Sequence, residues 1–492
     1  MTFISTRGHS EKVTAAQAIA KGLAPDGGLY VPESIPQLAE KDLAALCKMS
    51  YPERAAKILS LYLSDYTEEE LLEDCRAVYS ETSFVGGAAP LVALDDPLNV
   101  LELWHGPTAA FKDMALQIMP RLLSRALKKI GEKRTALILV ATSGDTGKAA
   151  LEGYKDLPQI KIIAFYPIDG VSKVQKLQMA TQLGKNVSVC AIRGNFDDAQ
   201  TGVKQIFGNA EIAKLLNEKD VFLSSANSIN WGRLAPQIVY YVSAYCDLIN
   251  AGKRKPGEPF NVCVPTGNFG NIFAAYLAKR MGLPINKLIC ASNSNNILTD
   301  FLSTGVYDRN RSFYLTMSPS MDILISSNLE RLLWATAGTE KTASYMKQLN
   351  ETGKYTVEAE TLAAIQKDFI GYFATEEETS ATILKFWNED HYLADPHTAV
   401  ALYSAQTYLK ETGDKIPMVV DSTASPYKFA NKVFRSITGK APSGDLEALD
   451  ELTELTGVSI PYPLAGLKNR AVRFKEVCEP SEMPDRVLQF AQ

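Results

Sequence analysis

The chain has 492 residues, which is too long for a single hydrophobic core and predicts two or three domains. Its 46% of hydrophobic and 22% of charged residues are typical of soluble globular proteins, and no apolar run approaches the roughly 18 residues of a membrane span. The start, MTFISTRGHSEK, lacks the apolar core of a signal peptide, so we expect a cytoplasmic protein without a membrane partner. The net charge of −5 disfavours a general nucleic-acid binder, so an anionic ligand would need a local positive pocket.

The cysteines and histidines show no metal-binding pattern. The seven cysteines form no CxxC pair, and several lie in apolar stretches such as FNVCVP, which predicts buried free thiols in a reducing compartment. The four histidines show no HExxH or Cys/His spacing, so we expect no zinc site.

Apolar runs and amphipathic segments alternate along most of the chain. Residues 11–80 look helical, and 111–130 reads as one long helix. Short, nearly continuous apolar runs between helical segments indicate strands of a buried parallel sheet, so we predict an α/β fold. These strands are expected at 99–104, 135–142, 161–167, 187–192, 261–265, 288–292 and 416–423.

Three domains are expected along the chain. We expect an N-terminal domain over 1–95, an α/β region over 96–250 that contains a mobile substrate-binding part at about 130–240, and a large α/β domain over 251–492. The polar run GKRKPGEP marks the last boundary. A helical insertion is expected at about 320–415, whereas the mixed pattern of 442–492 assigns no structure to that segment.

The motif WHGPTAAFKDMAL places Lys112 near a helix start, just after a strand and a Gly-Pro turn. The positive end of a helix dipole disfavours a nearby cation, which would make the neutral amine needed for Schiff-base chemistry easier to reach. Taken alone, the motif is more often a solvated first-turn lysine paired with Asp113.

The motif VPTGNFGN runs from a strand into a glycine-containing loop and then a helix. Backbone amides of such a loop can surround an anion, and the helix amino end adds partial positive charge. The motif is neither GxGxxG nor a P-loop, so a phosphate group is favoured over a nucleotide; an ordinary strand-to-helix turn is the alternative.

Three further loops follow predicted strands. VATSGDTG has hydroxyls and amides that could bind a carboxylate; alternatively, it only caps the following helix. SSANSINWGR carries Arg233, whose fork suits phosphate, although a helix cap with a surface arginine is the simpler interpretation. VVDSTASP places Ser422 and Thr423 just past a strand, at the edge where α/β sheets bind ligands. Alternatively, their hydroxyls only stabilise a turn.

Taken together, these motifs resemble threonine synthases, which are pyridoxal-phosphate enzymes of fold type II related to tryptophan synthase β. HGPTAAFKD resembles the family's lysine motif, TSGDTG its carboxylate loop and PTGNFGN its phosphate cup. GLAPDGGLYVPE, SPSMDI and DPHTAVA are also similar to family segments, and the matches run in family order from about residue 5 to about 430.

The resemblance implies a role for each matching residue. Lys112 would form the Schiff base with pyridoxal 5′-phosphate, and Thr423 would face the pyridine nitrogen. The cofactor phosphate would be held by Gly267, Asn268, Phe269, Gly270 and Asn271. The substrate carboxylate would be held by Ser143, Gly144, Asp145, Thr146 and Gly147, and the substrate phosphate by Asn227, Asn230 and Arg233. Asp145 would also lie near the cofactor's phenolic oxygen, where many fold-type II enzymes have an amide; a carboxylate cannot donate unless protonated, which leaves its contact open.

The activity implied is a carbon–oxygen lyase reaction, the conversion of O-phospho-L-homoserine and water to L-threonine and phosphate through a Lys112 aldimine, as the last step of threonine biosynthesis. The alternatives are another fold-type II lyase, such as a phospholyase or dehydratase of a hydroxy amino acid, a catalytically silent relative that only binds ligands, and a nucleotide-dependent enzyme. We expect a small-molecule substrate, no nucleic acid and a monomer or homodimer.

Overall fold

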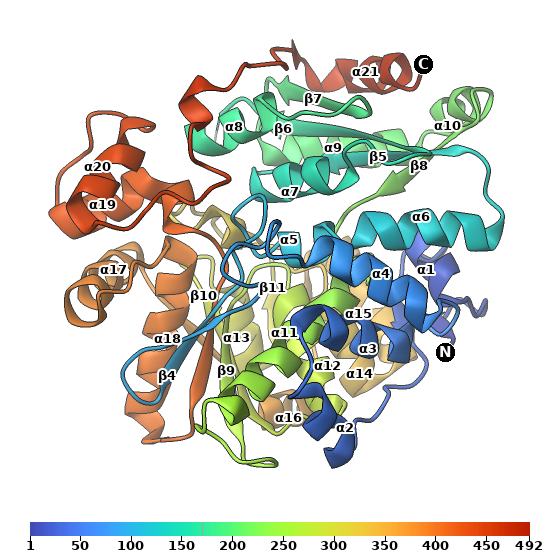
Figure 1. The fold of residues 1–492 in the computed structure, drawn as a ribbon. Helices are drawn as coiled ribbons and strands as arrows, with labels where there is room; N and C mark the ends of the chain where they lie inside the picture. Colours follow the sequence, from blue (N-terminus) through green and yellow to red (C-terminus); the bar gives the residue numbers. More distant parts are fainter. Residues whose placement is uncertain (170) are drawn as a thin grey trace.

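The computed structural model describes residues 1–169 and 171–492. Two parallel sheets dominate it, and they form two bodies stacked one above the other in Figure 1. Within the described residues, no helix has both the length and the apolar character needed to cross a bilayer.

The larger sheet has six strands in the order β13-β10-β9-β14-β4-β3, and only the edge strand β3 runs antiparallel to its neighbour. The strands are β3 (Leu91–Ala93), β4 (Leu98–Glu102), β9 (Phe260–Pro265), β10 (Ile285–Ser292), β13 (Phe369–Phe373) and β14 (Met418–Ser422). Alternate residues face opposite layers: Cys263 and Val420 pack under α18 (Pro396–Thr412), whereas Val262 and Val419 belong to the core that includes α11 (Trp231–Asn250) and α12 (Gly270–Arg280). Helices on both faces explain why these strands are apolar throughout.

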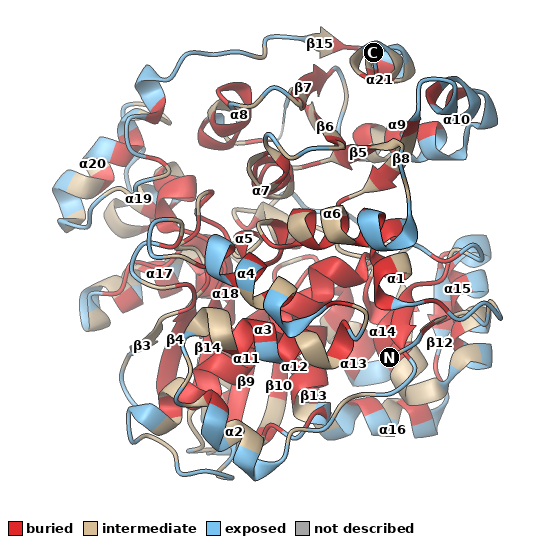
Figure 2. Cartoon of the chain, turned by 45° about the vertical axis from the view of Figure 1, so that its right-hand side comes forward, coloured by how far each residue is buried: buried red, intermediate tan, exposed pale blue. Residues whose placement is uncertain are grey.

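The smaller sheet is wholly parallel, in the order β15-β7-β6-β5-β8. Its strands are β5 (Thr135–Ala141), β6 (Ile160–Pro167), β7 (Val187–Ile192), β8 (Val221–Ser225) and β15 (Val477–Cys478). One face packs against α7 (Asp145–Tyr154) and α8 (Lys173–Ala180), and the other against α9 (Phe196–Gly208), α10 (Ala210–Asn217) and α21 (Met483–Phe490). Figure 2 shows the outer helix α10 largely exposed, whereas β5, β6 and β7 are mostly buried.

Helices of the N-terminal region cover α6 (Met119–Ile130) and α11. Its strands β1 (Phe3–Ser5) and β2 (Tyr30–Pro32) pair in antiparallel fashion, and the connection between them contains a helix. The region's helices are α1 (Ala15–Lys21), α2 (Glu40–Leu46), α3 (Tyr51–Tyr62) and α4 (Glu68–Val78). The remaining elements surround the larger sheet: α5 (Asp113–Leu116), α6 (Met119–Ile130), α13 (Ile297–Thr304), β11 (Val306–Asp308), α14 (Leu329–Ala337), α15 (Thr339–Thr352), β12 (Lys354–Thr356), α16 (Ala359–Asp368), α17 (Glu376–Asp390), α19 (Ala430–Thr438) and α20 (Glu447–Thr456).

The structure departs from the sequence expectations in four places. The helix expected over 111–130 is divided into α5 and α6, because Pro120 lacks an amide hydrogen and cannot continue a helix from the preceding turn. The segment 320–415 contains the strand β13 among its helices. Strand β4 joins the larger sheet, although it precedes the smaller sheet in sequence, and β15 joins the smaller sheet from the far end of the chain. The two sheets therefore exchange chain segments across the boundary expected near residue 251.

Candidate active site

The loops that carry the sequence motifs converge between the two sheets, each at the carboxyl end of a strand. They follow β4, β5, β8, β9 and β14. In parallel α/β sheets this edge is where ligands bind, because the strands end there and the following helices begin with free amides. A small cavity at this place is lined by Phe111, Lys112, Asp145, Ser320, His397, Thr423 and Ala424.

Lys112 is fixed by the backbone on both sides. Ala110 pairs with Ala424, and the amide of Phe111 donates to the carbonyl of Thr423 at 2.8 Å, which joins the lysine loop to the end of β14. Asp113 is fully buried and accepts hydrogen bonds from the amide and hydroxyl of Thr108, so it stabilises the turn and does not pair with Lys112. The solvated lysine–aspartate pair considered from the motif alone is therefore not formed.

The environment of Lys112 favours its neutral amine. Burial lowers the pKa of Lys112 to about 8, the nearby Lys428 and Arg233 cations act in the same direction, and Asp145 opposes them. The motif alone predicts this effect from a helix dipole. Because α5 is only four residues long, we assign it to burial and to the neighbouring cations instead.

The loop after β9 forms a cup of free backbone amides. Ser326 Oγ donates to the carbonyl of Gly267, and the amide of Asn328 donates to that of Asn268. In a trans peptide the carbonyl and the N–H of the following residue point in opposite directions. The two hydrogen bonds therefore turn the amides of Asn268 and Phe269 away from residues 326–328. Among the described residues, none accepts a hydrogen bond from the amides of 267–271.

Close packing explains why position 267 is a glycine, because a Cβ there would lie 2.8 Å from the Ser320 carbonyl. The backbone turns into α12 at Phe269, which adopts a left-handed φ of 62°. The side chain of Asn271 points elsewhere: its amide nitrogen donates to Asp421 at 3.0 Å, and its oxygen accepts from Tyr240 and Tyr241. Only its backbone amide is thus free for a ligand.

The loop after β5 also presents free amides. Thr142 Oγ1 accepts hydrogen bonds from Gly144 and Gly147, so these two amides are already engaged. In the described part of the chain, the amides of Ser143, Asp145 and Thr146 donate to no acceptor, and the Ser143 and Thr146 side chains are partly exposed. Of the loop, these three residues are therefore the ones equipped to bind a carboxylate.

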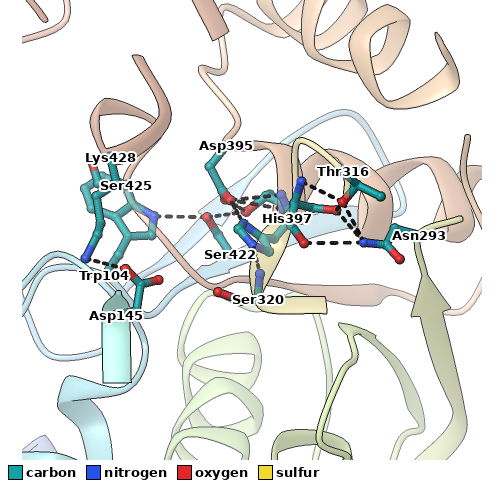
Figure 3. Close-up of polar contacts among 12 residues, drawn as sticks. Trp104, Asp145, Asn293, Thr316, Ser320, Asp395, His397, Ser422, Ser425 and Lys428 are labelled. Carbon is teal, nitrogen blue, oxygen red and sulfur yellow. Dashed lines mark hydrogen bonds and ion pairs between the residues drawn. The ribbon is translucent and has the colours of Figure 1, made fainter. Parts of the chain in front are cut away.

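Asp145 is ionised and accepts hydrogen bonds. Burial alone would raise its pKa, but the ammonium groups of Lys428 and Lys112 and a hydrogen bond from Gln175 hold the pKa of Asp145 well below its usual range. Its Oδ1 lies 2.8 Å from Lys428 Nζ and 2.7 Å from Gln175 Nε2, and its Oδ2 lies 3.9 Å from Lys112 Nζ. The contact that the sequence left open is therefore a buried ion pair, shown in Figure 3.

The two hydroxyl residues after β14 differ in their availability. Ser422 Oγ accepts from Trp104 Nε1 at 2.9 Å and from Thr398 Oγ1 at 3.0 Å. Thr423 lines the cavity, and its hydroxyl has no hydrogen-bond partner among the described residues. Thr423 is the one of the two that can contact a ligand.

Arg233 is a buried cation at the end of the site next to β8. Its side chain is 3% exposed, one nitrogen donates to the Ala226 carbonyl, and Nε has no partner in the described structure. Burial lowers the pKa of Arg233 to about 10, and no described carboxylate pairs with it.

Asn230 and Asn227 are placed differently from Arg233. Asn230 caps α11 through the amide of Gly232 and donates to the carbonyl of Ile19, so its side chain is engaged at both ends. Asn227 is exposed, and the structure gives no hydrogen bond to its side chain within the described chain. A direct contact of either residue with substrate stays a prediction.

Two further groups, which no sequence motif assigns to the site, lie in it. His397 bridges Asp395, at 2.7 Å from its Nδ1, and the amide of Ser320, at 3.1 Å from its Nε2, and so holds the 318–322 segment over the cavity (Figure 3). Lys428 is the other group. DPHTAVA was recognised only as a family-like segment, and no motif marked Lys428, which lies in the short turn after β14.

These residues fit pyridoxal phosphate. The free amides of 267–271 suit its phosphate, the buried amine of Lys112 suits its aldehyde, and the unpartnered hydroxyl of Thr423 suits its ring nitrogen. Within the described residues, there is no group of three or more histidine, cysteine, aspartate or glutamate side chains arranged for a metal ion.

Comparisons with known proteins identify the family of the chain. The family "Pyridoxal-phosphate dependent enzyme" matches residues 82–421, and the flanking matches are "Threonine synthase N terminus" at 2–79 and "Threonine synthase, C-terminal" at 398–483. Threonine synthase of Pseudomonas aeruginosa is 39% identical over 90% of this chain and 92% of its own length. Human threonine synthase-like 1 is 41% identical over 89% of this chain, but the match spans only 61% of the longer human protein.

Solved structures agree as well. The pyridoxal-phosphate-bound threonine synthase of Brucella melitensis has a TM-score of 0.88 and 38% identity, with both chains fully covered. The yeast threonine synthase has a TM-score of 0.89 and 34% identity, and covers all of this chain and 98% of its own. The chain therefore belongs to the threonine synthase family of pyridoxal-phosphate-dependent enzymes.

Proposed function

We propose that the chain converts O-phospho-L-homoserine and water to L-threonine and phosphate. The proposal is supported by the family, by a buried lysine with a lowered pKa and by two separate anion-binding regions in one site. The cofactor's phosphate would occupy the loop after β9. A substrate that carries both a carboxylate and a phosphate would need the loop after β5 for its carboxylate and Arg233 for its phosphate.

The observation that carries the proposal is the unpaired Arg233. A buried guanidinium without a carboxylate partner is costly, because its desolvation is not repaid by an attraction. Its free Nε donor in the site indicates that an anion completes it. A dianionic phosphate suits a guanidinium better than a second amino-acid carboxylate does, since it offers more acceptor oxygens for a bidentate contact.

The loop after β5 would orient the other end of the substrate. The free amides of Ser143, Asp145 and Thr146 at the start of α7 can hold the α-carboxylate, and the helix end adds partial positive charge. Arg233 and this loop would then fix the substrate at both ends, with the carbon to be deprotonated between them and beside Lys112.

When bound, pyridoxal phosphate supplies an electron sink that stabilises negative charge on the substrate carbons. Lys112 can take a proton from the substrate Cα, because its pKa of about 8 leaves part of the amine neutral near neutral pH. A second proton would then leave Cβ, and phosphate would leave Cγ with the bonding electrons. Cγ would gain a proton to become a methyl group, the hydroxyl of water would add at Cβ, and Cα would regain a proton. Arg233 would stabilise the charge of the departing phosphate. The segment 318–322, held by His397, would limit the access of bulk water.

Product analysis tests the proposal. The protein loaded with pyridoxal phosphate is incubated with O-phospho-L-homoserine, and released phosphate and amino acids are quantified. Equal amounts of threonine and phosphate are expected. A phospholyase would give 2-oxobutyrate and ammonia instead, and simple hydrolysis would give homoserine; either as the main product would overturn the proposal.

A further inference from the structure

Lys428 forms a buried ion pair directly beside the reactive lysine. Its side chain is 1% exposed, and it extends from the turn after β14 to the loop after β5. There its ammonium lies 2.8 Å from Asp145 Oδ1 and donates to the carbonyl of Thr108 at 2.9 Å. The contact joins the larger sheet to the start of α7 in the smaller one (Figure 3).

Asp145 has two ammonium neighbours at unequal distances. Lys428 is in hydrogen-bond contact with it, whereas Lys112 Nζ is 3.9 Å from the other carboxylate oxygen. A buried carboxylate requires a counter-ion, because an unpaired buried charge is costly. If Lys428 were absent, Lys112 would be the nearest cation to Asp145, and the carboxylate would stabilise its protonated, unreactive form.

We infer that Lys428 is a positioning residue that occupies Asp145 and thereby leaves Lys112 free to react as a neutral amine. This inference rests on the proposed function, in which Lys112 binds the cofactor. Lys428 acts through Asp145 and needs no contact with substrate.

The other charged groups around Lys112 cannot replace Lys428. Arg233 from α11 repels the Lys112 ammonium and donates to a backbone carbonyl, and Asp113 is engaged with Thr108. His397 from α18 lines the same cavity and is held by Asp395 and Ser320. Removal of Lys428 therefore has two effects on Lys112. It removes a cation that repels the Lys112 ammonium, and it leaves the Asp145 carboxylate free to attract it. Both raise the pKa of Lys112.

The pH dependence of cofactor uptake measures this effect without turnover. Apoprotein is mixed with pyridoxal phosphate between pH 6.5 and 10, the rate of imine formation is followed by absorbance, and Lys112 is verified by borohydride trapping and peptide mapping. Ionisations of the free cofactor are the same for every variant, so differences between midpoints report the protein. We expect Lys428→Met to raise the midpoint by about one pH unit or more, which is a tenfold or larger loss of neutral amine at a given lower pH.

The double variant Asp145→Asn with Lys428→Met isolates the charge. Both Lys428→Met proteins lose the bond to the Thr108 carbonyl, but only the single variant leaves Asp145 without its counter-ion. The double variant should therefore return towards the wild-type midpoint. Lys148→Met is the matched control, because Lys148 is another buried lysine of the same region, and it pairs with Glu152 at 3.0 Å. It should leave the midpoint unchanged.

The outcomes separate this inference from the proposed function. An unmoved midpoint in Lys428→Met, or a double variant that behaves like the single one, overturns the role of Lys428. If Lys428→Met does not fold, Asp145→Asn alone decides: its midpoint should fall below wild type, and a rise overturns the inference. Wild-type protein that forms no imine on Lys112 overturns both proposals, whereas a normal wild-type imine with unmoved variants overturns this one only.

Discussion

The amide of Phe111 donates to the carbonyl of Thr423 at 2.8 Å, and this bond sets the residue before the reactive lysine beside the hydroxyl residue at the end of β14. The two segments lie about 310 residues apart in sequence, yet they pair like adjacent strands through Ala110 and Ala424. A ligand bound to Lys112 therefore meets Thr423 at a separation fixed by backbone rather than by flexible side chains.

Lys112→Ala should give a folded protein that binds no cofactor covalently. The adjacent backbone bonds do not involve the side chain, so the fold is expected to persist. Borohydride reduction of wild-type holoenzyme, followed by peptide mapping, should place the reduced cofactor on Lys112. A label on Lys148 or on another lysine would contradict the assignment.

Thr423→Asp should lower turnover and change the cofactor spectrum more than Thr423→Ser does. A hydroxyl can donate to the ring nitrogen without transferring its proton, whereas a carboxylate stabilises the protonated ring. Thr423→Ser is the conservative control because it keeps the unpartnered hydroxyl. Equal rates and spectra for the two variants would remove Thr423 from the ring contact.

Arg233→Ala should weaken phosphohomoserine binding and spare cofactor binding. A hydrogen bond to a charged group contributes about 1.5–3 kcal/mol, which corresponds to a roughly ten- to hundred-fold loss of affinity. KM for phosphohomoserine and the affinity for pyridoxal phosphate are measured in parallel. Unchanged kinetics would place the substrate phosphate elsewhere and leave Arg233 with a structural role only.

In heavy water the reaction should place deuterium at two carbons of threonine. The Cγ methylene becomes a methyl group and gains one hydrogen, and Cα regains the proton removed by the base. Return of the substrate's own proton by Lys112 can dilute the label, so partial incorporation agrees with the mechanism. Threonine with an unlabelled methyl group in the NMR spectrum would contradict it.

Asp421→Asn should stabilise the apoprotein at pH 8. Burial raises the pKa of Asp421 to about 7, only partly offset by hydrogen bonds from Tyr241 and Asn271. Between about pH 4 and pH 7, the folded protein therefore holds a proton that the unfolded chain has lost. The free energy of unfolding falls by up to about 4 kcal/mol as the pH rises through this range, and it is constant above it. The oxygen of the new amide can still accept the hydrogen bonds that Tyr241 and Asn271 donate to Oδ2.

Thermal melts at pH 5 and pH 8 test this prediction. The melting temperature of the wild-type apoprotein should fall between these pH values more than that of Asp421→Asn. Parallel changes in the two proteins would show that another group controls the dependence.

The positions of the central strands were predictable because nearly continuous apolar runs have few other uses in a soluble protein. Strand β13 was not, since its five residues FIGYF lie within a segment of helical periodicity. The exchange of β4 and β15 between sheets was also hidden, because periodicity identifies a strand without naming its neighbour.

The site was predictable where a motif ends a strand, as for Lys112 and the loop of 267–271. It was not predictable where a residue's importance comes from a distant partner. Lys428 has no local signature, and its importance comes from its ion pair with Asp145, which lies at the start of α7 beside the other sheet. Local sequence likewise could not show which of Ser422 and Thr423 is available to a ligand. The two differ because the Ser422 hydroxyl already accepts hydrogen bonds from Trp104 and Thr398.

The strand β15 has a consequence for how the protein is made. The four other strands of the smaller sheet lie within residues 135–225, but β15 and the helix α21 that covers it lie within residues 477–490. During synthesis, the edge of β7 therefore stays open long after the four other strands have been made, until residue 478 has emerged. An open strand edge invites pairing with another chain. Nascent chains that stop before residue 477 should consequently be the species most prone to aggregate and to engage chaperones.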